Sequence, residues 1–142
     1  MPRKEFIFGK MKQNDFRGSS GWEYEGEINL EGKRHNRGVM VWTNGSLYEG
    51  YWKTDKQHGR GRLIYGNGMT HYSGEWKYGK KEGSGDEHYR DGTFYKGHWK
   101  KGVRHGAGIV KLQNGKLMRG VWENDRLISW TSKPFDEKTL KL

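Results

Sequence analysis

The chain has 142 residues and a formal net charge of +10, with a pI near 9.7. Leu, Ile, Val and Phe together make up only 23 residues, and such a low content combined with this charge is typical of disordered chains. The absence of cysteine excludes disulfides and thiolate metal sites. The positive charge favours anionic partners, which could be acidic proteins, lipid headgroups or nucleic acid.

The first 21 residues lack the pattern that fills the rest of the chain. They carry Phe6, Ile7, Phe8 and Phe16 among basic and polar residues, which predicts an N-terminal extension over 1–21 that packs somewhere. The segment has no apolar core of a secretory signal, and no apolar run approaches transmembrane length. A mitochondrial presequence stays open because basic residues are frequent, although Glu5 and the scarcity of serine argue against it. We expect an intracellular protein.

From about residue 22 the frame Tyr-x-Gly-x-Trp recurs, with steps of 24, 24, 23 and 23 residues. In the first copy Ile28 replaces the Trp, and in the last Met118 replaces the Tyr. A period of this size indicates small supersecondary units that become stable by stacking on their neighbours, and terminal units are often degenerate because they cap the array. The five frames begin at Tyr24, Tyr48, Tyr72, Tyr95 and Met118.

Each repeat is predicted to be a β-hairpin. Tyr48, Gly50 and Trp52 occupy alternate positions and so share one face of a strand, and a second alternating run follows about ten residues later. Asn-Gly or Asp-Gly dipeptides separate the repeats, and they favour tight hairpin turns because such turns need positive φ. The glycines Gly59, Gly83 and Gly106 are interpreted as the end of a wider turn after each Trp.

The sequence therefore predicts an all-β fold, an elongated single-layer antiparallel β-meander of about ten strands. We place the repeat array at 22–130 and a C-terminal tail at 131–142, which should fray if nothing holds it. The five tandem repeats span about 22–43, 44–66, 67–90, 91–113 and 114–130.

The frame Tyr-x-Gly-x-Trp, a turn, His-Gly-x-Gly and then Asn/Asp-Gly resembles the MORN (membrane occupation and recognition nexus) repeat family. The resemblance covers 22–130 and departs at Glu82, which replaces His, and at Glu87, which replaces an apolar residue. The best-matching residues are Tyr48, Gly50, Trp52, His58, Gly59 and Gly61; then Tyr72, Gly74, Trp76, Gly83 and Gly85; then Tyr95, Gly97, Trp99, His105, Gly106 and Gly108.

This resemblance implies a non-catalytic scaffold, a rigid rod that joins other subunits of a larger assembly in a cilium, a flagellum or the cytoskeleton. The alternative is a module that binds phosphoinositides or another anionic membrane surface. Nucleic acid is a less favoured partner because the aromatic residues belong to the repeat face. The chain shows no nucleophile with a base, no metal-ligand spacing and no phosphate-binding loop, so we expect neither enzyme activity nor a cofactor.

Glycine at the centre of each frame should let rings from neighbouring strands lie across the bare backbone. The repeat glycines are Gly26, Gly50, Gly59, Gly61, Gly74, Gly83, Gly85, Gly97, Gly106, Gly108 and Gly120.

The aromatic face of a single-layer sheet needs a cover. Three covers stay open: the twist of the sheet, a helix or strand of another chain, or the terminal extensions, which carry Phe6, Ile7, Phe8, Phe16, Phe135, Leu140 and Leu142. We expect another chain to cover at least part of this trough. Its residues are Tyr24, Trp42, Tyr48, Trp52, Tyr65, Tyr72, Trp76, Tyr89, Tyr95, Trp99 and Trp122.

The turns after each Trp are rich in Lys and Arg, whereas the Asn-Gly turns are close to neutral. Because turns alternate between the two long edges of a meander, one edge should be basic and could face an acidic protein or lipid headgroups. Its residues are Lys33, Arg34, Arg37, Lys53, Lys56, Lys77, Lys80, Lys81, Lys100, Lys101 and Arg104.

Overall fold

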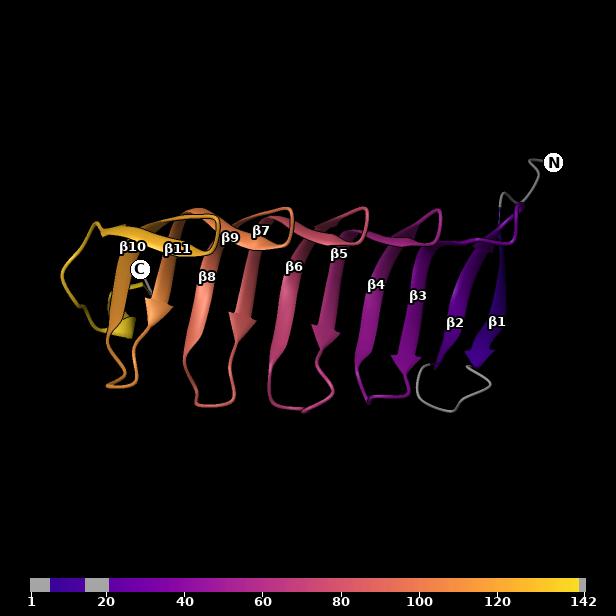
Figure 1. Cartoon of the computed structure of the whole chain (residues 1–142), viewed down its shortest axis with the longest axis horizontal. Coiled ribbons are helices and arrows are strands. Elements are labelled where there is room, and N and C mark those ends of the chain that lie inside the picture. The colour runs from indigo at the N-terminus through magenta and orange to yellow at the C-terminus, as the bar shows by residue number, and fades with distance from the viewer. Residues whose placement is uncertain (1–5, 15–20, 141–142) are drawn as a thin grey trace.

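The computed structural model describes residues 6–14 and 21–140. Its strands form one antiparallel sheet in which each strand pairs with its neighbours in the sequence (Figure 1). The strands are β1 (Phe6–Asn14), β2 (Gly21–Asn29), β3 (Arg34–Trp42), β4 (Leu47–Lys53), β5 (Lys56–Ile64), β6 (His71–Lys77), β7 (Lys80–His88), β8 (Phe94–Lys100), β9 (Val103–Lys111), β10 (Leu117–Glu123) and β11 (Arg126–Trp130), and one short 3₁₀ helix, η1 (Glu137–Leu140), follows them.

The predicted single-layer meander is confirmed, and the ten strands expected of the repeat array are β2 to β11. The sheet gains an eleventh strand from the N-terminal extension, where β1 pairs with β2 in unbroken register from Phe6 opposite Asn29 to Asn14 opposite Gly21. Part of the extension, which we expected to pack somewhere, is thus the first strand of the rod. Phe16 and Leu142 lie outside the described residues.

The strands bend sharply at their central glycines, and Figure 1 shows their upper parts turning away from the direction of the lower parts. In an extended strand, residues i and i+4 lie about 13 Å apart, yet the ring centroids of Tyr48 and Trp52 are only 5.0 Å apart. The register shifts between Gly50 and Trp52, and equivalent shifts occur in the other four hairpins. Such bulges bend a strand, so each hairpin folds over its own aromatic residues.

The bend follows a row of glycines that lie opposite one another in successive strands. At Gly61 an added Cβ would lie 2.1 Å from the Tyr48 hydroxyl oxygen, which shows that the Tyr ring occupies the space of the missing side chain. The row consists of Gly9, Gly26, Gly38, Gly50, Gly61, Gly74, Gly85, Gly97, Gly108 and Gly120.

The sequence predicted tight turns at the Asn-Gly dipeptides and wider turns after each Trp, and the structure shows the opposite arrangement. The turns after Trp52, Trp76, Trp99 and Trp122 contain two residues, and both have positive φ, as at Thr54 (48°) and Asp55 (71°). These are the tight hairpins, because strands with a right-handed twist need this turn geometry. The Asn-Gly segments instead form longer loops, in which Asn44 Oδ1 accepts from the Ser46 amide at 2.9 Å.

Gly59, Gly83 and Gly106 therefore do not end a wide turn. They lie inside β5, β7 and β9 with φ of 81°, 71° and 88°, the left-handed region that the bulged strand requires. The first repeat has Asn36 in this slot, with φ of 61°. Asn is among the few other residues that adopt this conformation readily, which explains the substitution.

The C-terminal tail is held along the edge of β10. Phe135 exchanges two backbone hydrogen bonds with Leu117, at 2.8 and 2.9 Å, and its ring lies under the Arg119 guanidinium at 4.4 Å. Ion pairs from Lys116 to Asp136 and from Lys111 to Glu137 hold the segment beyond it. The tail is thus anchored to its own sheet.

Replacing the glycine under the Tyr ring should destabilise the rod. Gly61→Ala forces its Cβ into the Tyr48 ring, and overpacking of this kind typically costs about 1–3 kcal/mol of unfolding free energy. Denaturant unfolding followed by Trp fluorescence would measure the loss. The control is Arg60→Ala at the exposed neighbouring position, expected to stay within about 0.5 kcal/mol of the parent. Equal effects of the two substitutions would contradict the close contact.

Candidate interaction surfaces

The predicted aromatic trough is largely the core of the protein. Its Tyr and Trp rings alternate along the rod, and each Tyr from the second to the fourth repeat stacks edge-to-face on the Trp of its own hairpin and on that of the next. The centroid distances in this ladder lie between 5.0 and 5.5 Å. The buried rings are Tyr24, Tyr48, Trp52, Tyr72, Trp76, Tyr95, Trp99 and Trp122, and none is more than 6% exposed.

The polar atoms of these rings are also used inside the sheet. The Tyr48 hydroxyl donates to the Tyr51 carbonyl at 2.7 Å, and the Trp52 indole N–H donates to the Gly38 carbonyl at 3.1 Å. The same two bonds recur in the next two repeats. The bend of the sheet therefore supplies the cover for which we expected another chain, whereas Trp42, Tyr65 and Tyr89 remain half-buried at the surface.

Three residues of the predicted basic edge point inward over the rings. Arg34, Lys81 and Arg104 occupy the same position in successive hairpins, where the second repeat has Gln57. The Arg34 guanidinium lies 4.9 Å from the Trp52 centroid, and the Lys81 ammonium lies 4.7 Å from that of Trp99. We call this position the cation slot. Its side chains cover the aromatic core and are not free for a partner.

The cation slot joins each repeat to the next. Arg34 donates through Nε to Asp55 Oδ1 at 3.0 Å, and Arg104 makes the same bond to Asp125 at 2.6 Å. Burial raises the pKa of Tyr95 to about 12, and the positive charge of Arg104 opposes part of that shift. Sequence reasoning missed this link, although the sequence contains a signal for it. In both repeats with Arg in the cation slot, an Asp follows 21 residues later.

A second link uses the His position of the repeat. His35 Nδ1 accepts from the Thr54 amide and His58 Nδ1 from the Tyr78 amide, each at 3.2 Å, so the first turn residue of the next hairpin is held. Glu82 in the third repeat accepts from the Lys101 amide at 2.9 Å. Glu82 therefore replaces His but still accepts a hydrogen bond from the turn of the next hairpin.

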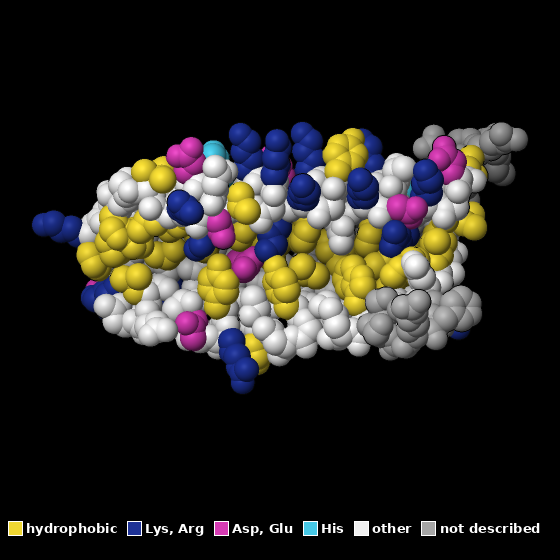
Figure 2. Space-filling view, viewed as in Figure 1, with side chains coloured by type: hydrophobic (Ala, Val, Ile, Leu, Met, Phe, Trp, Pro, Cys, Tyr) yellow, Lys and Arg dark blue, Asp and Glu magenta, His cyan; other side chains and the backbone are white. Residues whose placement is uncertain are grey.

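The exposed part of the basic edge consists of lysines that flank or lie within three successive two-residue turns. Lys53 lies directly opposite Lys56, and Lys77 directly opposite Lys80. Among the residues that the structure describes, these lysines make no ion pair. Figure 2 shows Lys and Arg side chains along this upper edge of the rod. We define the lysine edge as Lys53, Lys56, Lys77, Lys80, Lys100 and Lys101, all of them exposed.

The other two basic-edge residues, Lys33 and Arg37, have local partners. Lys33 lies 3.7 Å from the carboxylate of Glu31, and Arg37 lies over the Tyr51 ring at 5.6 Å. They belong to the first repeat, where the loop is longer, so they do not continue the lysine edge.

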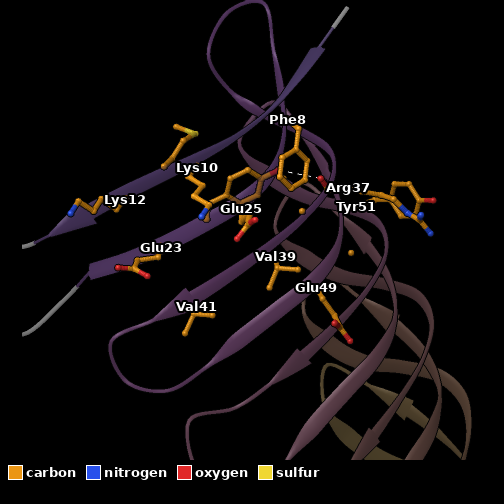
Figure 3. A pocket seen from close by; sticks show the side chains of 15 residues that line it. Phe8, Lys10, Lys12, Glu23, Glu25, Arg37, Val39, Val41, Glu49 and Tyr51 are labelled. Carbon is orange, nitrogen blue, oxygen red and sulfur yellow. Dashed lines mark hydrogen bonds between the residues drawn. The ribbon is translucent and has the colours of Figure 1, made fainter.

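A groove of about 1000 Å³ lies on the outer face of β1 to β4, opposite the aromatic core (Figure 3). Phe8, Val39, Val41 and Tyr51 supply exposed apolar surface there. Charged side chains of both signs surround it: Lys10, Lys12, Glu23, Glu25, Arg37 and Glu49. Sequence reasoning missed this groove, although the apolar Val39 and Val41 at outward positions are a signal for it.

The sequence profile of the MORN repeat matches four consecutive segments, residues 24–47, 48–70, 72–94 and 95–116. The chain belongs to the MORN-repeat family. MORN repeats are in general non-catalytic and take part in protein or membrane interaction. In the described part of this MORN chain, no helix is long and apolar enough to span a membrane, and no group of three metal-ligating side chains comes together.

Much larger proteins contain similar stretches. The chain is 38% identical over 55 residues to the inactive protein tyrosine kinase pTKL of Plasmodium berghei, a match covering 39% of this chain and 4% of that protein. It is 37% identical over 67 residues to alsin from mouse and from human, covering 44% of this chain and 4% of alsin. The MORN chain thus matches only a small part of each relative.

The His link of this MORN array should make its stability depend on pH. Burial, with the nearby Lys53 and Lys77, lowers the pKa of His58, because protonation would cost the folded state more than the unfolded chain. The stabilising contribution is therefore complete above the ordinary His pKa and is lost as pH falls through the lower folded value.

We expect the unfolding free energy to fall between about pH 7.5 and pH 5, since an ordinary His titrates near 6.5. His58→Glu, which imitates Glu82, should weaken this dependence because a carboxylate remains an acceptor over the range. Denaturant titrations at several pH values would measure it. If the variant showed the same pH dependence as the parent, His58 would not be the source of this dependence.

The largely buried ion pair of the third repeat gives a second test. Lys81 and Glu87 are 13% and 12% exposed in their side chains, and the ammonium contacts the carboxylate. Glu87→Leu should lower the unfolding free energy by about 3 kcal/mol, because it removes the carboxylate that neutralises Lys81 and leaves the ammonium, among the described residues, with only the Tyr65 hydroxyl. The double variant that adds Lys81→Met should regain most of the lost unfolding free energy. Apolar side chains fit this site, since Leu63 and Val110 occupy the position of Glu87 in the neighbouring repeats. A double variant no more stable than Glu87→Leu would contradict this account.

Proposed function

We propose that this chain is a non-catalytic structural protein, a rigid MORN rod that contacts other proteins within a larger assembly through its lysine edge. The partner surface in this proposal is acidic. The observation that carries it is the pairing of Lys53 with Lys56 and of Lys77 with Lys80 across adjacent strands.

Opposed lysines are costly to the fold itself. Like charges directly opposite on two strands destabilise the pair, and nothing among the described residues neutralises these ammonium groups. Several basic residues elsewhere in the same sheet have a carboxylate partner, as Arg34 has Asp55 and Arg104 has Asp125. An unmatched row on one edge is what an anionic partner requires.

The rod keeps this row in fixed spacing. Successive tight turns are two strands apart, and adjacent strands lie about 4.8 Å from each other, so the lysine pairs recur at roughly 10 Å. The Tyr–Trp ladder fixes the turns relative to one another, and two-residue turns leave little freedom at the edge. A partner with acidic groups at a matching spacing would meet several lysines at once.

The groove on β1 to β4 supports a scaffold with more than one contact. It lies on the outer face near the N-terminal end, whereas the lysine edge follows the turns from β4 to β9. A rod carrying two separated surfaces of different chemistry could hold two partners at a set distance. The cilium and the cytoskeleton are the locations we propose for it, by analogy with the family.

Binding to an anionic membrane is the second candidate, and the lysine edge is the observation that favours it. Basic residues near an anionic leaflet contribute about 1 kcal/mol each, and this attraction falls off within a Debye length. The exposed lysines form one row along a straight edge, which a flat headgroup layer could also contact.

Neutralising part of the lysine edge should separate these functions. We expect Lys56→Gln, Lys80→Gln and Lys100→Gln together to remove the protein partners captured from native cells at about 0.15 M salt, and to raise the unfolding free energy slightly because like-charge pairs disappear. The control carries Arg60→Gln, Arg90→Gln and Lys133→Gln, exposed positions off the lysine edge with the same change in net charge.

Protein partners retained by the control and lost by the edge variant would support the scaffold. Sedimentation with anionic vesicles, run in parallel, would identify the membrane function if vesicles bind and no protein does. Equal capture by both variants would contradict a role for the lysine edge.

A further inference from the structure

The sheet ends at β1 on a strand whose outer edge no other described strand covers. β1 has nine residues and pairs with β2 without a bulge, whereas each hairpin of the repeat array contains one. Ile7 is 62% exposed and Phe8 69% exposed. A long, regular, partly apolar edge of this kind is a template for another strand.

The backbone groups that such a strand would meet can be assigned. The Thr43 amide donates to the Gly21 carbonyl, so odd-numbered residues of β2 direct their backbone groups toward β3. Even-numbered residues of β2 therefore face β1, and their partners there include Gly9 and Met11. It follows that Phe8, Lys10 and Lys12 direct their N–H and C=O groups outward.

The opposite end of the rod is a poorer template. β11 has only five residues, and its register with β10 is broken between Val121 and Trp122. After β11 the chain turns back, and Phe135 pairs with Leu117 on the same edge of β10. Short length and irregular pairing protect edges from addition.

We propose that β1 pairs antiparallel with β1 of a second copy of this chain, with the two Gly9 residues opposite each other. The glycine row gives this register, since Gly9 already lies opposite Gly26 and each later pair of neighbouring strands as far as β9 and β10 also sets Gly against Gly. The bend line of the sheet then continues through the interface, and both copies fold toward the same face.

The same register is self-complementary in its side chains. Lys10 and Lys12 lie opposite Phe8 and Phe6 of the second copy rather than opposite its lysines, so a cation meets a ring. Ile7 lies opposite Met11 of the second copy on the inner face. Within one chain, Lys10 and Lys12 already face Glu25 and Glu23 of β2, which compensates their charge.

A symmetric strand pair of this kind is an isologous interface, closed at two copies. Sedimentation equilibrium of the full chain between micromolar and millimolar concentration should therefore reach twice the chain mass of 16.6 kDa, and no more. A chain that stays at 16.6 kDa over the whole range would overturn the proposal.

Two substitutions should keep the chain monomeric by different means. Lys10→Pro removes an outward N–H without touching the bonds to β2, and its control, Lys10→Ala, keeps the N–H and should dimerise. Phe8→Lys leaves the backbone intact and sets a lysine opposite Lys10 of the second copy. Near-UV circular dichroism would show that each variant is folded. A dimer that persists in both Lys10→Pro and Phe8→Lys would exclude this edge.

The register has its own test, because the chain contains no cysteine. Residues 7 and 11 of the two copies would form non-hydrogen-bonded pairs, whose Cα atoms lie about 4.5 Å apart, within reach of a disulfide. We expect mild oxidation to cross-link the double variant Ile7→Cys, Met11→Cys into a dimer and to leave each single variant uncross-linked. Cross-linking of a single variant, or of none, would refute the Gly9 register.

Discussion

The edge-to-face stacking of Tyr on Trp over bare glycine backbone is the contact on which this protein depends. The Tyr48 ring occupies the volume that a side chain at Gly61 would need, and the Trp of the same hairpin reaches it because the strand bends at Gly50. Aromatic pairs of this geometry contribute about 0.5–1.5 kcal/mol beyond the area they bury. Repetition of the contact gives a chain poor in aliphatic residues a continuous core.

That core leaves the Tyr and Trp residues of the buried ladder little part in recognition. Their rings are buried and their polar atoms are bonded within the sheet, so the exposed chemistry lies on the two-residue turns and on the outer face of β1 to β4. One face of each strand therefore packs into the core of the rod, and the edges and the opposite face remain accessible to partners.

The basic residues divide in the same way. Arg34, Lys81 and Arg104 are internal, because a cation in the slot covers a ring and, in both arginine repeats, binds the turn of the next hairpin. The residues of the lysine edge, which precede the cation slot by one to four residues, are exposed and make no ion pair among the described residues. Net charge alone is thus a poor measure of the binding surface, since part of it stabilises the stacking of the repeats.

The sequence by itself determined the repeat, its period, the hairpin in each unit and the ten strands of the array, because glycine, Tyr and Trp at fixed spacing allow few other arrangements. It did not determine which edge has the tight turns, since an Asn-Gly dipeptide fits both a two-residue turn and a longer loop. Nor could it show that Arg34 points inward while Lys53 points out, or that β1 extends the sheet. Only the tertiary structure decided these, because the bend at each glycine brings together residues that an extended strand would hold about 13 Å apart.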